Sequence, residues 1–288
     1  MATITITLRE TGQSVTATLK AAASPPKIKD FVVDEEGYIT KVSETNGDNM
    51  YRLHRKTNWD KGIKDKYITL NNGKVIEELA ERRNVYKSSS GFWGEKEGVF
   101  VKMASKDDAY KLFKFVCDAS LQAEWALYVY EKRKSKVSIY ILATSNFSES
   151  PGVVPLPDGF SFFDLKINYH SHPGSTPRDD KASAQVDDAI GDLPQANGYY
   201  DKFLSAKERN LPAFIIYRSH REKVPYKFQY TNLVNLIEGT KKVVNTYKDL
   251  YDGIIFYIQK ELISSGESGL LVYSTSFSEH KDVIKQSF

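Results

Sequence analysis

One stretch near the middle of the chain alternates apolar and polar residues and then ends in two histidines. It reads FSFFDLKINYHSHPG, residues 160–174. Successive side chains of a β-strand point to opposite faces, so the alternation predicts a strand that ends at Pro173-Gly174. His170 and His172 are two residues apart and therefore share one face, with Asp164, Lys166 and Asn168. The opposite, apolar face is formed by Phe163, Leu165, Ile167 and Tyr169.

Two imidazoles at one strand end suit two ligands of a single metal ion. Only five histidines occur in the chain, and its single cysteine, Cys117, excludes a four-cysteine zinc site and an internal disulfide. A third ligand would come from the acidic loop that follows, and a His₂Asp set leaves a fourth position for water, as in catalytic zinc sites. A pair of hydrogen-bonded histidines at a strand end is the alternative. The carboxylates of that loop are Asp179, Asp180, Asp187, Asp188 and Asp192.

Glu124 is a candidate general base for such a site. It stands at the head of the expected strand AEWALYVY, next to Trp125, in an apolar setting where a carboxylate is costly without a purpose. A metal-assisted hydrolysis needs a group that takes a proton from the attacking water.

The surrounding segments predict a mixed α/β domain. Ser105 is a good helix N-cap, and apolar residues at helical spacing follow it through Cys117. We expect a hairpin over 123–145, a helix around 194–209, a buried strand at 212–219 with a partner at 226–230, helical spacing over 232–265 and a strand at 269–276. The first third is β-rich, with a hairpin within 1–22, and His54 stands alone there, which favours a surface or interface role.

Charge and hydropathy exclude several classes of function. The net charge of +3 is the difference between 40 basic and 37 acidic groups, so a nucleic-acid partner is not expected. The basic run at 131–136 is typical of a solvated hairpin tip. The N-terminus lacks the plan of a signal peptide, and no window reaches the ~18 apolar residues of a membrane span.

Glu124, the tetrapeptide His170-Ser171-His172-Pro173 and the downstream serine and aspartates resemble the JAMM/MPN zinc metalloproteases. Their pattern is an upstream glutamate, H-[ST]-H-P, and then a serine and an aspartate. The stretches AEWALYVY, YHSHPGSTP, GD and PAFIIYR resemble still more closely the JAB-like toxin domains of bacterial polymorphic toxins. This resemblance covers roughly residues 105–230, and DFVVDEEGYITKV resembles the pre-toxin region before such domains.

The resemblance implies an α/β (α+β) fold with an MPN/JAMM-like mixed sheet flanked by helices, after a small β-rich N-terminal region. It divides the chain into a delivery or loading segment with a linker (1–27), a pre-toxin region (28–100), a catalytic domain (101–231) and a C-terminal helical extension (232–288). It also implies that His170 and His172 bind Zn²⁺ and that Glu124 is the general acid/base.

The third ligand is less sharply defined by the resemblance. We favour Asp192, because Gly191-Asp192 resembles the GD pair of the toxins. Asp187 is the second candidate and Asp188 also competes, while Ser183 is the candidate serine that stabilises the oxyanion. None of these aspartates reproduces the S-x-x-D spacing of the family.

The function implied is zinc-dependent hydrolysis of a peptide or isopeptide bond in a protein substrate by a bacterial effector. Such an effector would leave its cell without a signal peptide, through a secretion apparatus or with a chaperone. It would act in the cytoplasm or periplasm of a target cell, and a cognate immunity protein would block it. A non-catalytic MPN-like binding module and a deubiquitinase-like isopeptidase within a complex are the alternatives.

Overall fold

The computed structural model describes most of the N-terminal two thirds of the chain and short segments beyond. The described residues are 2–7, 14–19, 26–46, 48–90, 94–146, 154–173, 199, 202–203, 205–208, 212–217, 226–230, 270–274 and 284–285.

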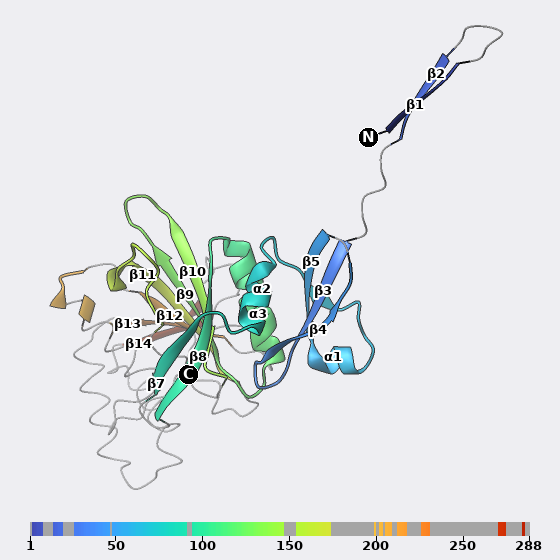
Figure 1. Cartoon of the computed structure of the whole chain (residues 1–288). Helices are drawn as coiled ribbons and strands as arrows, with labels where there is room; N and C mark the ends of the chain where they lie inside the picture. Colours follow the sequence, from blue (N-terminus) through green and yellow to red (C-terminus); the bar gives the residue numbers. More distant parts are fainter. Residues whose placement is uncertain are drawn as a thin grey trace.

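A nine-stranded mixed sheet is the largest element of the fold (Figure 1). Its strand order is β15-β14-β13-β12-β11-β9-β10-β8-β7. In chain order, the strands are β7 (Val85–Ser90), β8 (Gly94–Met103), β9 (Trp125–Glu131), β10 (Ser138–Thr144), β11 (Leu165–Ser171), β12 (Ala213–Tyr217), β13 (Tyr226–Tyr230), β14 (Leu270–Ser274) and β15 (Ile284–Lys285).

The centre of this sheet agrees with the expected pattern of strands. β9 and β10 form the predicted hairpin, and the basic run lies at its exposed tip. β11 pairs antiparallel with β9 and parallel with β12, and β13 returns antiparallel beside β12. The histidine strand is therefore an inner strand, bounded on both sides by hydrogen-bonded neighbours.

A second sheet has four strands in the order β4-β3-β5-β6. These are β3 (Pro26–Val33), β4 (Ile39–Glu44), β5 (Asp48–Arg55) and β6 (Tyr67–Ile68), and the short helix α1 (Lys56–Asp60) follows β5. β3 and β4 are antiparallel neighbours, whereas β3 and β5 run parallel. The remaining strands, β1 (Ala2–Thr7) and β2 (Ser14–Leu19), form the hairpin expected within residues 1–22.

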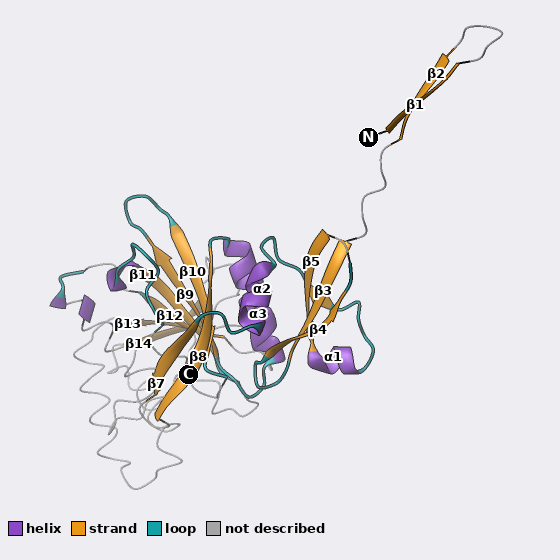
Figure 2. Cartoon of the chain, in the orientation of Figure 1, coloured by secondary structure: helices purple, strands orange, loops and turns teal. Residues whose placement is uncertain are grey.

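Helices α2 (Lys74–Ala80) and α3 (Lys106–Ala119) lie between the two sheets (Figure 2). The Ser105 hydroxyl accepts a hydrogen bond from the Asp108 backbone N–H, which confirms the predicted N-cap. Buried side chains from both sheets and both helices form one continuous cluster, including Phe31, Leu53, Ile76, Leu112 and Trp125. Residues on either side of the expected boundary at 100/101 thus share a core, and β8 runs across that boundary.

Two expectations about the described residues were wrong. β11 begins only at Leu165, because Phe162–Asp164 form a 3₁₀ turn, and the pairing with β9 shifts register between Leu165 and Ile167. Leu165 therefore pairs with Tyr130 and lies on the same face of the sheet as His170. It does not share the apolar face of Tyr169, which the alternation predicted. The surface position, one of the two roles expected for His54, was also wrong, because its side chain is fully buried.

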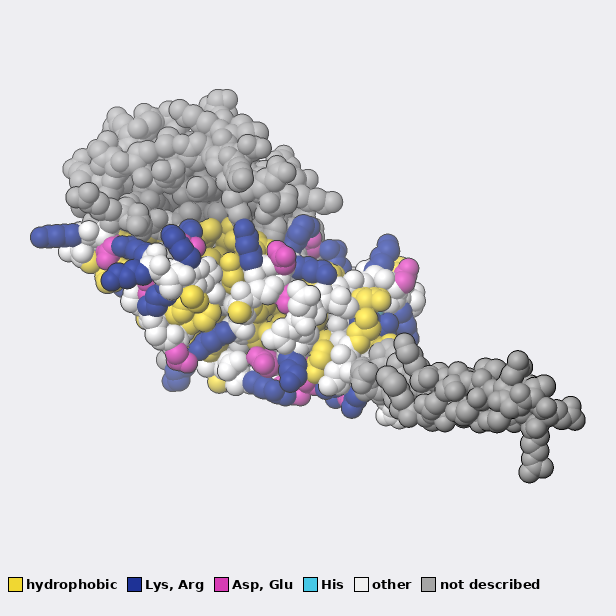
Figure 3. Space-filling model, turned by 90° about the horizontal axis from the view of Figure 1, so that it is seen from above, with side chains coloured by type: hydrophobic (Ala, Val, Ile, Leu, Met, Phe, Trp, Pro, Cys, Tyr) yellow, Lys and Arg dark blue, Asp and Glu magenta, His cyan; other side chains and the backbone are white. Residues whose placement is uncertain are grey.

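The described surface mixes basic and acidic side chains, as Figure 3 shows for one face. Among the described helices, none is long and apolar enough to cross a membrane. The region 232–265, with its expected helical spacing, lies outside the described residues, whereas the strand expected at 269–276 is confirmed as β14. Tyr199, Lys202, Phe203 and Ser205 are helical, within the helix expected around 194–209.

Candidate metal centre

β11 brings the two histidine rings together at its C-terminal end. The Nε2 atoms of His170 and His172 lie 3.1 Å apart, and the ring centroids are 5.0 Å apart. His170 is buried and pairs with Ala126 of β9 and with Ile216 of β12. The small side chain at Ala126 leaves space for an imidazole on this face.

The separation of the two nitrogens fits zinc coordination. Two nitrogen ligands at the usual Zn–N distance of about 2.0–2.1 Å in a tetrahedron are about 3.3 Å apart. The observed 3.1 Å lies close to that value. The same distance also fits a hydrogen bond in which one Nε2 donates to the other. The rings are thus arranged as two ligands of one ion would be. A slightly larger separation of the two Nε2 atoms would match the tetrahedral value.

Glu124 comes directly before β9, and His172 comes directly after β11. β9 begins at Trp125, and continuing the register of His170 with Ala126 by two residues places Glu124 across from His172. Directly opposed residues of an antiparallel pair share a face, so Glu124 belongs to the histidine face. Its backbone carbonyl accepts a hydrogen bond of 2.8 Å from the Thr144 hydroxyl, and its side chain is half-buried.

Ser171, between the two histidines, points to the opposite face of the sheet. Its hydroxyl accepts a hydrogen bond of 2.9 Å from the Trp125 backbone N–H, and it also contacts the Cys117 thiol of α3. Burial raises the pKa of the Cys117 thiol. Sequence reasoning missed the role of Ser171, although its position between two same-face histidines already assigns it to the other face.

A second missed residue, Asn168, lies two positions before His170 on the same face. It is buried, and neither its amide nitrogen nor its amide oxygen has a hydrogen-bond partner among the described residues. It pairs with Tyr128, whose pKa is raised by burial. Buried amides normally have partners, so this pair of polar atoms adds an unsatisfied donor and acceptor to the histidine face. Its place two residues before His170, on the polar face of the alternating strand, was the available sequence signal.

The comparison with protein families matches residues 101–197 of this chain to the model described as JAB-like toxin 1. Residues 101–197 are therefore similar to a JAB-like toxin domain. The match spans α3, β9, β10 and β11, and with them Glu124, His170 and His172. No curated protein and no solved structure matches the chain. The mixed architecture of a sheet flanked by helices confirms the expected MPN/JAMM-like fold class.

The remaining candidate residues of the JAB-like toxin domain follow β11. Ser183, Asp187, Asp188 and Asp192 lie within the matched range but outside the described residues. Within the described part of the chain, no group of three or more histidine, cysteine or acidic side chains is placed to hold a metal ion. The described site is thus two histidines with Glu124 nearby, and the third ligand stays a prediction.

A pocket of about 180 Å³ lies where the connection between β3 and β4 and helix α2 meet the start of β9. Trp125 and Asn146 line it together with Gly37, Tyr38 and Arg82 from the N-terminal part of the chain. Because Trp125 alternates with Glu124 and Ala126 along the chain, this pocket opens on the opposite face of the sheet from His170. Neither His170 nor His172 lines it.

Proposed function

We propose that this chain is a zinc-dependent hydrolase of peptide or isopeptide bonds, acting as a bacterial antagonistic effector. The observation that carries the proposal is the 3.1 Å separation of the Nε2 atoms of His170 and His172. The β9–β11 register, continued past the ends of both strands, places Glu124 across from His172. The JAB-like toxin match supports the assignment of this chemistry to a toxin or effector domain.

His170 and His172 would hold the ion together with one aspartate, of which Asp192 is our first choice and Asp187 the second. A bound zinc ion supplies a water of lowered pKa, near 7, and polarises the scissile carbonyl. The donor set fits, because imidazole and carboxylate are the usual ligands of catalytic zinc and the fourth position stays open.

The Glu124 carboxylate would accept the proton of the attacking water and return it to the leaving amine. Its half-buried position raises the strength of electrostatic interactions without isolating it from solvent. Ser183 is our candidate for donating a hydrogen bond to the charge that develops on the carbonyl oxygen. Among the candidate residues, Glu124 is the only one proposed to move a proton.

The biological setting that we propose follows from the family. The segment 1–27 would serve loading onto a secretion apparatus or chaperone, and the target would be a protein in the cytoplasm or periplasm of another cell. A cognate immunity protein would cover the histidine face of the domain. Substrate specificity would reside in loops around that face.

The test compares the wild-type protein with Glu124→Gln after expression in bacteria. Glu124→Gln removes the proton acceptor but neither proposed histidine ligand, so zinc per chain should stay equal while growth inhibition falls by about 10²-fold or more. Cleavage of di-ubiquitin by the purified protein would favour the deubiquitinase-like alternative. Equal growth inhibition by the two proteins would refute the proposed mechanism.

A further inference from the structure

The turn between β3 and β4 has a specific shape that depends on Gly37. Within residues 34–38, the Asp34 carboxylate accepts a hydrogen bond from the Tyr38 N–H over 2.8 Å, and the Gly37 N–H donates to the Asp34 carbonyl over 3.2 Å. Gly37 has φ +80°, a conformation that a residue with a side chain rarely adopts. We call residues 34–38 the β3–β4 turn.

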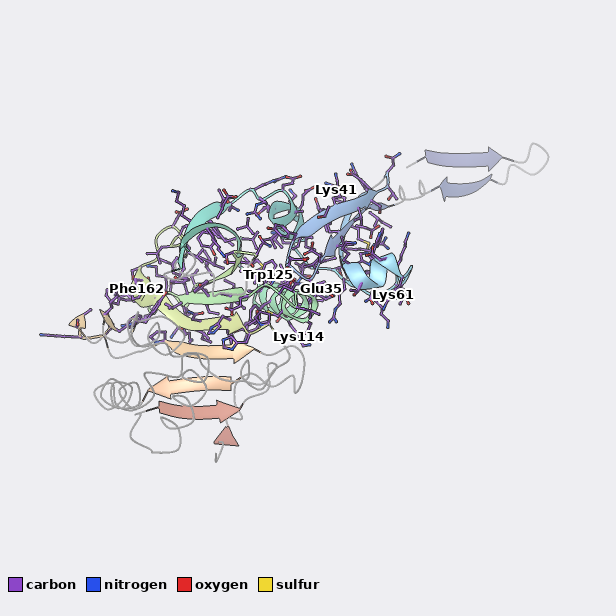
Figure 4. The ribbon with its side chains drawn as sticks, turned by 90° about the horizontal axis from the view of Figure 1, so that it is seen from below. Glu35, Lys41, Lys61, Lys114, Trp125 and Phe162 are labelled. Carbon is purple, nitrogen blue, oxygen red and sulfur yellow. The ribbon has the colours of Figure 1, made fainter. Side chains whose placement is uncertain are left out.

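This turn packs directly on the segment that carries Glu124. The Gln122 backbone N–H donates to the Glu35 carbonyl over 2.9 Å; Figure 4 labels Glu35 and Trp125. Gly37 is buried, and a Cβ added to it would lie 3.2 Å from the Ala123 Cβ and 3.2 Å from the Trp125 Nε1. The turn therefore touches the residues on both sides of Glu124, so closely that an added methyl group would displace its neighbours slightly.

A chain of hydrogen bonds makes a second connection between the turn and Glu124. The Asn146 side-chain amide donates to the Glu36 carbonyl over 3.3 Å, and the Asn146 backbone N–H donates to the Thr144 hydroxyl over 3.0 Å. That hydroxyl in turn donates to the Glu124 carbonyl over 2.8 Å. The position of the Glu124 backbone is thus linked to the turn through side chains at the end of β10.

We infer that the β3–β4 turn is a positioning element for the general base, so that the pre-toxin region contributes to catalysis by the JAB-like toxin domain. This inference rests on the proposed function, because it assigns the turn a role through Glu124. Gly37 is a positioning residue and touches neither substrate nor metal. Its effect is to hold the 120–125 segment, and with it Glu124, opposite His172.

The energetic reason is the sensitivity of proton transfer to distance. A displacement of about 1 Å at a reacting group lowers a rate by about 10²-fold, even when the change is made far from the chemistry. Glu124 lies before the first residue of β9, so its backbone is not held by the β9 ladder. Two contacts replace that support. Ala123 and Trp125 lie against Gly37, and the Glu124 carbonyl accepts the hydrogen bond from the Thr144 hydroxyl.

Three glycines with the same backbone conformation provide a matched experiment. Gly37, Gly62 and Gly159 have φ of +80°, +76° and +73°, so an alanine is similarly strained at each. A Cβ at Gly62 or Gly159 meets nothing within 4 Å, whereas at Gly37 it meets the Glu124 segment. Gly62→Ala and Gly159→Ala thus control for backbone strain alone.

The experiment measures growth inhibition, zinc per chain and amide hydrogen exchange for the full-length variants, below the unfolding temperature of each. We expect Gly37→Ala to retain zinc, to speed exchange of the Gln122 amide and to lower growth inhibition about tenfold or more. The two control glycine variants should stay within about twofold of wild type, as expected for strain at sites without contacts. Asn146→Gly, which keeps the allowed φ of +55° and removes the bond to Glu36, should give a smaller loss and serves if Gly37→Ala does not fold.

A Gly37→Ala protein that exchanges Gln122 faster but inhibits growth like the controls would overturn the inference, because the contact would then only stabilise the fold. Full inhibition by Asn146→Gly would overturn it equally when Gly37→Ala is unfolded. Glu124→Gln separates this failure from that of the proposed function. If Glu124→Gln inhibits growth like wild type, the base itself is misassigned, and both proposals fail.

Discussion

The backbone N–H of Trp125 donates a hydrogen bond to the Ser171 hydroxyl over 2.9 Å, in the interior of the protein. This bond joins the first residue of β9 to the last residue of β11. Glu124 precedes Trp125, and Ser171 separates His170 from His172. The bond therefore connects the segment of the candidate base to the segment of the candidate zinc ligands. It lies on the opposite face of the sheet from their side chains.

Ser171→Ala should destabilise the protein without removing zinc. The substitution leaves the buried Trp125 N–H without its acceptor, which costs about 1–3 kcal/mol of the free energy of unfolding. Urea unfolding followed by tryptophan fluorescence measures this difference. Ser135→Ala, at the exposed β9–β10 tip, is the control and should change the free energy by less than about 0.5 kcal/mol. Equal stability of the two variants would show that the bond contributes nothing.

Asp30→Asn should strongly destabilise the four-stranded sheet. The Asp30 carboxylate is buried and accepts hydrogen bonds from Arg52 at 2.6 Å and 2.9 Å and from Ser43 at 2.6 Å, and its Oδ1 lies 2.9 Å from the His54 Nε2. Removing the charge leaves the partly exposed Arg52 guanidinium without its charged partner, at a cost of about 1.5–3 kcal/mol. Asp60→Asn breaks an exposed ion pair with Lys56 and should cost less than about 1 kcal/mol.

The same carboxylate predicts a dependence of stability on pH. Burial alone would raise the pKa of Asp30, but hydrogen bonds from Arg52, Ser43 and His54 outweigh it and lower the pKa from 3.8 to about 2. The unfolded chain binds more protons in that window, so the contribution is present above about pH 4 and is lost as the pH falls through 2. This contribution amounts to about 2 kcal/mol of the free energy of unfolding. It is measured as the decrease, on acidification, in the difference between the unfolding free energies of wild type and Asp30→Asn.

Asp108→Ala should weaken the attachment of helix α3 to the residues before α2. The buried Asp108 carboxylate accepts the backbone N–H groups of Asn71 and Asn72, each over 3.0 Å. Hydrogen bonds to a charged group contribute about 1.5–3 kcal/mol, so we expect a loss of that size in thermal or urea unfolding. Asp107→Ala removes an exposed carboxylate from the same helical turn and is the matched control. Comparable losses in the two variants would contradict this role.

The sequence correctly predicted the features that depend on residues within a single helix or strand. Helix α3 begins after Ser105 as its N-cap predicts, because the cap and the apolar spacing act within a few turns. His170 and His172 share a face because β11 is regular from Ile167 to Ser171. Alternation failed earlier in the same strand, where the register shifts by a residue without a glycine or proline to signal it.

Contacts between distant segments could not be read from local patterns. His54 is buried beside Asp30, which lies 24 residues earlier, because β3 and β5 run parallel as neighbours. The packing of Gly37 against the segment before β9 likewise depends on how the small sheet meets α3. Nothing in the sequence linked the Glu36-Gly37 turn to Glu124.

Zinc per chain, measured by elemental analysis of the purified protein, tests the central claim most directly. We predict about one zinc ion per wild-type chain and almost none in the His170→Ala/His172→Ala double variant, while a folded Glu124→Gln protein retains the ion. A wild-type protein that binds no more zinc than the double variant would contradict the metal site, and would leave the 3.1 Å approach of the two rings as a hydrogen bond between histidines.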